Sequence, residues 1–117
     1  MKIRISFEVF TEYMKVNLSG DSLYAEIKDV LMNIRKLAEE NNHTRIIIDA
    51  VNTKVLSEME KFSVGEIGVD IFGNKFKIAV IAKPEVINKF MENVAVNRGG
   101  RVYVTSSEQK ALSWLLK

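Results

Sequence analysis

The chain has 117 residues with a net charge of +2, and 47% of them are hydrophobic and none is cysteine. This length suits a single core, so we expect one domain over residues 1–117. The lack of cysteine excludes disulfides and thiolate chemistry. The first residues alternate between apolar and polar, unlike a signal peptide, and no apolar run approaches the roughly 20 residues that span a bilayer. We therefore expect a cytoplasmic protein that does not span a membrane.

Basic residues are denser in the C-terminal part of the chain than elsewhere. They are not interleaved with aromatic residues, and no nucleic-acid-binding motif accompanies them. We interpret them as a solvated charged surface and expect no nucleic-acid partner.

Two stretches near the start, residues 2–9 and 13–18, alternate between apolar and polar side chains. This period of two predicts an antiparallel hairpin with one buried face. On the first strand, the expected buried residues are Ile3, Ile5, Phe7 and Val9.

A helix is predicted next, with Asp21 and Ser22 as candidate N-caps. Its apolar residues recur at spacings of three and four, and they are Leu23, Ile27, Val30, Leu31, Ile34, Leu37 and Ala38. The helix is expected to end at residues 41–43, because asparagine tolerates the left-handed conformation of a helix C-terminus.

Residues 45–49 and 76–82 are short apolar runs without polar alternation, which indicates strands buried on both faces. Asp49 is expected to end the first of them. Residues 59–72 between them favour a helix, although Gly65 and Gly68 lower its propensity.

A further helix is predicted to begin at Pro84 and to end near Gly99. Its expected inward residues are Val86, Ile87, Phe90, Met91, Val94 and Ala95. A last strand is predicted at residues 101–105, followed by a C-terminal helix that a capping box of Ser106 and Gln109 opens.

The order is therefore strand, strand, helix, strand, helix, strand, helix, strand, helix. It predicts an α/β fold with a mixed, mostly parallel sheet of about five strands and about four helices packed against it. Binding sites in such sheets form beyond the carboxyl ends of the strands, which here lead into Asp49, Lys83 and Thr105.

Three segments in this order, MEKFSVGEIG, VAVNRGGRVYV and EQKALSWLL, resemble those of SpoIIAA-like domains, the STAS/SEC14-type branch of the STAS superfamily. The resemblance covers nearly the whole chain and implies the SpoIIAA-like fold. It also implies a regulatory role, because STAS domains are mostly non-enzymatic modules that bind partners, such as antagonists of anti-sigma factors. Several are switched by phosphorylation of a serine at a helix start, within an Asp-Ser-Ser-Gly pattern.

Ser63 is the nearest match to that switch serine, and a phosphate at a helix start would be well placed. The surrounding motif departs from the family pattern, because Lys61 and Phe62 precede Ser63. Ser63 is thus either a regulated serine or a plain surface or packing residue. Ser57 is the alternative site, and we expect it to be a helix N-cap.

We expect a contact surface around the end of the third strand, the loop after it and the helix that follows. Its candidate residues for binding a partner or ligand are Asp49, Val55, Met59, Phe62, Ser63 and Glu66. For Asp49 two interpretations stay open, since its carboxylate either accepts hydrogen bonds from the following loop or contacts the partner.

The residues give little support for catalysis. Glu66 and Asp70 lie four residues apart, but no histidine or further acidic run accompanies them. The only histidine, His43, lies in a polar connection and gives no basis for a Ser-His-Asp triad. We therefore expect no catalytic residues, no metal site and no cofactor.

The leading hypothesis is a non-enzymatic regulatory or protein-interaction domain with an unidentified protein partner. The alternative is a domain that binds a small apolar or lipid-like ligand in a pocket between the 59–72 helix and the sheet. Monomer and homodimer both stay open. Self-association through an exposed sheet edge or through an apolar helix face stays open, although Lys2, Arg4 and Glu8 on the first strand suggest an edge that is protected against pairing.

Overall fold

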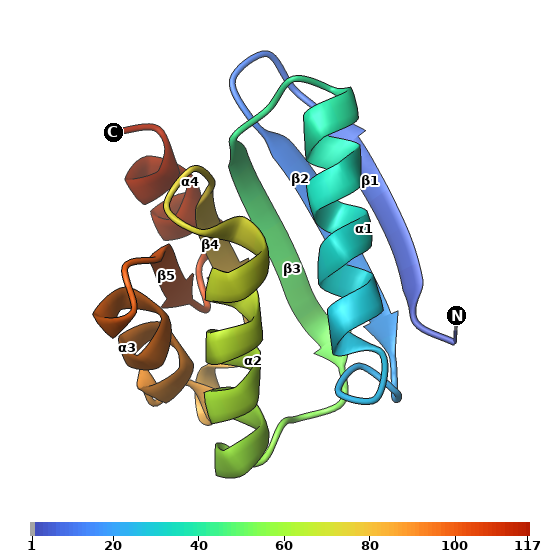
Figure 1. Cartoon of the computed structure of the whole chain (residues 1–117), viewed down its shortest axis with the longest axis vertical. Helices are drawn as coiled ribbons and strands as arrows, with labels where there is room; N and C mark the ends of the chain where they lie inside the picture. Colours follow the sequence, from blue (N-terminus) through green and yellow to red (C-terminus); the bar gives the residue numbers. More distant parts are fainter. Residues whose placement is uncertain (1) are drawn as a thin grey trace.

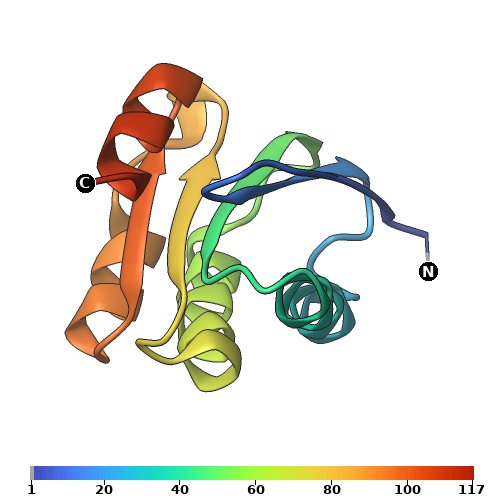
Figure 2. The same cartoon turned by 90° about the horizontal axis from the view of Figure 1, so that it is seen from above.

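The computed structural model describes residues 2–117, with the side chain of Val86 left aside. Five strands form one sheet, and helices lie on both of its faces (Figures 1 and 2). The strands are β1 Arg4–Val9, β2 Met14–Gly20, β3 Arg45–Thr53, β4 Lys77–Ile81 and β5 Arg101–Thr105. The helices are α1 Ile27–Glu40, α2 Glu58–Phe72, α3 Phe90–Asn97 and α4 Glu108–Leu115, with a short 3₁₀ turn, η1, at Pro84–Val86.

The strands lie in chain order across the sheet. β1 pairs with β2 in the antiparallel direction, and β2 through β5 are parallel to one another. The predicted α/β fold, the hairpin and the mostly parallel sheet are therefore confirmed.

The central strand β3 is buried on both faces, as its three consecutive isoleucines predict. Ile46 and Ile48 belong to the larger core beneath α1 and α2, whereas Ile47 belongs to a second core beneath α4. The predicted apolar stripe of α1 lies in the larger core, with Leu37 packed at its margin. α3 packs beside α2 and β5 (Figure 1).

The expected burial of β1 is only partly right. Ile3 is buried and Ile5 half-buried, but Phe7 is 42% exposed and Val9 is 47% exposed. β1 is the outermost strand, so its side chains have a neighbouring strand on one side only.

Asp21 and Ser22 do not cap α1, which begins at Ile27. The preceding residues form a turn in which the Ser22 hydroxyl donates to the Glu26 carboxylate. That carboxylate also accepts the amides of Lys2 and Ile3, at 2.9 and 3.1 Å. The prediction was wrong because Glu26 ties the helix start to the beginning of β1.

β3 runs four residues beyond Asp49, so the prediction that Asp49 ends the strand is also wrong. Pairing with β4 stops at Asp49, but pairing with β2 continues to Thr53, opposite Gly20. The longer neighbour β2 extends the strand past the apolar run that was visible in the sequence.

The single helix predicted from Pro84 is instead η1, an extended residue at Ile87, and α3. Lys89 has a left-handed backbone, with φ of 65°, and its side-chain amine donates to the Val104 carbonyl. Glu92 accepts the Val104 amide at 2.6 Å. Both side chains thus bind the outer edge of β5, which the break in the helix allows. The position expected for Val86 lies outside the described side chains.

α3 ends at Asn97, and Gly99 just beyond it has the predicted left-handed conformation, with a φ of +93°. The Gly100 amide donates to the Ala95 carbonyl at 2.9 Å and the Gly99 amide to Val96 at 3.0 Å, which is a Schellman motif. α4 begins one residue later than expected, because Ser107 rather than Ser106 accepts the helix amide, that of Lys110.

The two glycines of α2 occupy different surroundings. A Cβ on Gly65 would lie 3.0 Å from the Met91 carbonyl oxygen and 3.0 Å from a Val94 methyl group, so Gly65 lets α2 and α3 approach closely. A Cβ on Gly68 would meet nothing within 4 Å.

We predict that Gly65→Ala and Gly68→Ala change stability in opposite directions. Overpacking at Gly65 costs about 1–3 kcal/mol, more than the ~1 kcal/mol that alanine gains over glycine in a helix. At Gly68 only the gain applies. Urea denaturation of both variants measures this, and a Gly65→Ala protein as stable as Gly68→Ala would contradict the close packing.

Candidate functional site

A four-residue loop, residues 54–57, connects the end of β3 to α2. Ser57 caps the helix, as predicted, because its hydroxyl accepts the Glu60 amide at 3.2 Å. Glu60 accepts the Ser57 amide in return at 2.8 Å, which completes a capping box. The start of α2 is therefore fixed by its own sequence.

Apolar side chains gather at this end of the molecule without being buried. Val55 is 50% exposed, Met59 is 81% exposed and Phe62 is 38% exposed. Phe90, at the start of α3, is 36% exposed, and its ring centroid lies 6.1 Å from that of Phe62. We call these four residues, Val55, Met59, Phe62 and Phe90, the α2 N-terminal surface.

Polar contacts between α2 and residues 88–98 fix the side chains around this surface in place. Arg98 lies over the Phe62 ring, 6.0 Å from its centroid, and forms an ion pair with Glu66 at 2.5 Å. Asn88 donates to the Glu58 carboxylate at 2.7 Å. Glu66, a predicted contact residue, is therefore already bound to Arg98.

The pKa of Glu58 lies below its ordinary value. The hydrogen bond from Asn88 is the main cause, and the hydrogen bond and charge of Lys61 add to it. Glu58 thus stays ionised in the first turn of α2, where a negative charge also favours the helix dipole.

Ser63 lies in the second turn of α2 and is half-buried. A helix start at Glu58 leaves Ser63 outside the first turn, whose free amides bind anions. It follows Met59 by four residues and so shares its face of the helix. A charge on Ser63 would therefore lie beside the α2 N-terminal surface.

Asp49 is not part of that surface. Side chains alternate along a strand, and Ile48 faces α1 and α2, so Asp49 points to the opposite face of the sheet with Ile47. It is half-buried, and its carboxylate accepts the Val51 amide at 3.1 Å. The structure therefore separates Asp49 from the other five candidate residues.

A cleft of about 130 Å³ opens beneath the start of α2, at the carboxyl ends of β3, β4 and β5. Its apolar lining includes Leu18, Leu23, Ile27, Ile48, Val64 and Val80. Val55 and Phe90 of the α2 N-terminal surface also line it, as do Lys54, Lys61, Lys83 and Lys89.

Sequence reasoning expected Lys83 at a strand end but missed Phe90 and the other lysines of this cleft, Lys54, Lys61 and Lys89. Phe90 was assigned to a buried helix face, and the left-handed Lys89 that turns it outward has no sequence signature of its own. The lysines are scattered along the chain, and only the folding of two loops over the strand ends brings them together.

The described residues contain no group of three acidic or histidine side chains that could hold a metal ion. Glu66 is paired with Arg98, and Asp70, near the end of α2, is exposed. Within residues 2–117 no helix is long and apolar enough to cross a membrane.

Two solved structures match nearly the whole chain. An anti-sigma factor antagonist from Mycobacterium paratuberculosis is 13% identical, with a TM-score of 0.67 over 98% of this chain and 95% of that one. An uncharacterized protein from the DUF3478 family with a SpoIIAA-like fold, from Shewanella loihica, is 21% identical, with a TM-score of 0.61 over 97% of this chain and 93% of that one. This chain has a SpoIIAA-like STAS fold. No protein-family model matches this chain, and no curated protein matches it either.

Proposed function

We propose that this SpoIIAA-like domain is a regulatory module that acts by binding a protein partner rather than by catalysis. The exposure of the α2 N-terminal surface is the observation that carries the proposal. Clustered aromatic and methionine side chains at a surface are typical of binding sites. The fold shared with an anti-sigma factor antagonist supports a regulatory role. We further propose a cytoplasmic location, which the lack of cysteine supports.

The contact residues in this proposal are Val55, Met59, Phe62 and Phe90. Met59 is the most exposed of them and contributes little to folding, whereas the Phe62 and Phe90 rings support each other. A partner with an apolar patch would bury these side chains, and the acidic first turn of α2, with Glu58 and Glu60, favours a basic rim around that patch.

We still propose that Ser63 is phosphorylated, but the effect of the phosphate would differ from that of a phosphate at a helix start. A phosphate there would add roughly two negative charges one helical turn from Met59. The phosphate would not bind the helix N-terminus. It would weaken partner binding through like-charge repulsion or through the cost of desolvating the phosphate at the interface. Ser57 is engaged in the capping box, so its phosphorylation would disrupt the start of α2.

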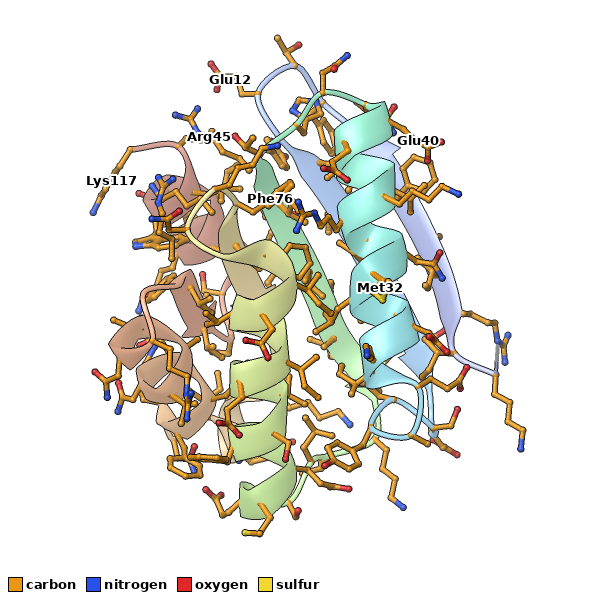
Figure 3. All side chains as sticks on the ribbon, viewed as in Figure 1. Glu12, Met32, Glu40, Arg45, Phe76 and Lys117 are labelled. Carbon is orange, nitrogen blue, oxygen red and sulfur yellow. The ribbon has the colours of Figure 1, made fainter. Side chains whose placement is uncertain are left out.

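Replacing Met59 by glutamate tests the contact surface. We expect Met59→Glu to leave folding unchanged and to weaken partner binding at least about tenfold, because a charge would be buried in the interface. Met32→Glu is the matched control, since Met32 is 53% exposed on the outer face of α1 (Figure 3). Quantitative affinity capture from the native cell, with phosphosite analysis at Ser63 and Ser57, provides the measurement.

Three outcomes of this experiment are informative. A partner lost with Met59→Glu and kept with Met32→Glu supports the surface. Equal capture by both variants contradicts it. A phosphate found at Ser57 but never at Ser63 would contradict the regulatory part alone.

The cleft favours a second candidate function, the binding of a small apolar or lipid-like ligand. Its walls are almost entirely apolar, and four lysines border them. A volume of about 130 Å³ lies below the ~300–1,000 Å³ typical of drug-sized ligands. The ligand would therefore be a short apolar chain, with an anionic end near the lysines.

Native mass spectrometry of the freshly purified protein tests this alternative. A bound ligand predicts a mass above that of the bare chain, lost when Val64 is replaced by tryptophan to fill the cleft. Gly68→Trp is the control, because its position is open and outside the cleft. A bare mass under all gentle conditions would contradict ligand binding.

A further inference from the structure

The two edges of the sheet are treated differently. At β5, the Val104 amide and carbonyl that do not pair with β4 are bound by Glu92 and Lys89. At β1, no described segment lies along the outer side of the strand. Unpaired edges attract other strands, and so proteins usually cover or interrupt them.

The groups available on the β1 edge follow from the hairpin register. The Phe10 amide donates to the Tyr13 carbonyl at 2.9 Å, and the strand partners of the hairpin continue this register from Val9 opposite Met14. Bonded and non-bonded pairs alternate along an antiparallel ladder. The amides and carbonyls of Arg4, Ser6 and Glu8 therefore face β2, and those of Ile5, Phe7 and Val9 face outward.

The side chains of β1 form two sets. Ile5, Phe7 and Val9 lie on the α1 side of the sheet, and the latter two are nearly half exposed. Arg4, Ser6 and Glu8 are exposed on the other side. Among the ion pairs of the described residues, none includes Arg4 or Glu8, and Lys15, opposite Glu8, binds Glu108 instead at 3.1 Å.

We propose that two copies of this chain associate through antiparallel pairing of their β1 strands, about a two-fold axis at Ser6. In this register Ile5 of one copy pairs with Phe7 of the other, so the outward amides and carbonyls meet. Arg4 of each copy lies opposite Glu8 of the other, which pairs two charges that are otherwise unpaired. The two five-stranded sheets become one continuous sheet.

Charge pairing between residues of β1 itself favours this register over its neighbours. Shifting either copy by two residues toward the hairpin turn places Phe7 opposite Phe7 and leaves Arg4 opposite Phe10. Shifting it the other way places Ile5 opposite Ile5, Arg4 opposite Ser6 and Glu8 opposite Lys2, which lies before the start of β1. Only the register centred on Ser6 makes both Arg4–Glu8 pairs, and it also joins the exposed Phe7 side chains to Ile5 of the other copy.

This association goes beyond the proposed function and leaves its surface free. β1 lies on the far side of α1 from α2 (Figure 1). It also gives the charges of β1 a different role from the protective one that the sequence suggested. Arg4 and Glu8 would exclude foreign strands while selecting a second copy of the same strand.

Charge reversal tests the register by sedimentation equilibrium. Arg4→Glu and Glu8→Arg should each raise the dimer dissociation constant about tenfold or more, because each places like charges opposite one another twice. The double variant Arg4→Glu/Glu8→Arg should recover wild-type association. An equimolar mixture of the two single variants should form mixed dimers, since one chain is then acidic and the other basic at both positions.

A disulfide tests the axis independently. The chain has no cysteine, so Ser6→Cys introduces a single thiol. Opposed residues in a non-bonded antiparallel pair have Cα atoms about 4.5 Å apart, within the ~4.4–6.8 Å that a disulfide spans. Under mild oxidation Ser6→Cys should form a covalent dimer much faster than Ser113→Cys, an exposed control on α4, and adding Arg4→Glu should slow it.

Circular dichroism of each β1 variant serves as the control for folding, and it should match that of the wild-type protein. A wild-type protein that remains monomeric at every concentration overturns the proposal. A dimer whose dissociation constant is unchanged by the charge reversals also overturns it. So do equal rates of covalent dimer formation by Ser6→Cys and Ser113→Cys.

Discussion

The burial of β3 on both faces is the constraint on which the rest of the structure depends. Ile46 and Ile48 require cover on one side and Ile47 on the other, so α1 and α2 must lie opposite α4. The same alternation then decides where function can lie. It turns Asp49 toward the α4 side and leaves the loop and the helix start beyond the strand to form the exposed surface.

That surface depends on the close approach of α2 and α3. Gly65 lets the helices meet, and the Arg98–Glu66 ion pair and the Phe62–Phe90 contact continue their interface toward the solvent. Because the Phe62 and Phe90 rings are supported from within the chain, they can be presented to a partner at a small cost in side-chain entropy. The capping box at Ser57 fixes the direction in which α2 leaves the loop.

Local patterns in the sequence predicted what local forces decide. The isoleucine run, the α1 stripe, the Ser57 cap and the glycine at the end of α3 all appear as expected. Tertiary contacts decided the rest. Glu26 bound the start of β1 and shortened α1, and the long β2 extended β3. The predicted helix broke before α3, where Lys89 and, in the first turn of α3, Glu92 bind the β5 edge. Of the candidate site, exposure at Met59 was foreseeable. Asp49 fell outside the surface because β3 continues past it and side-chain alternation turns it to the α4 side.

The central claim is that the surface at the start of α2 meets a partner in the cell. Placing the photo-reactive residue p-benzoylphenylalanine at position 59 tests it most directly, with position 32 on α1 as the control, since both native methionines are exposed. Illumination of intact cells should link position 59 to one protein that position 32 does not capture. The same adducts at both positions, or none at position 59, would contradict the account.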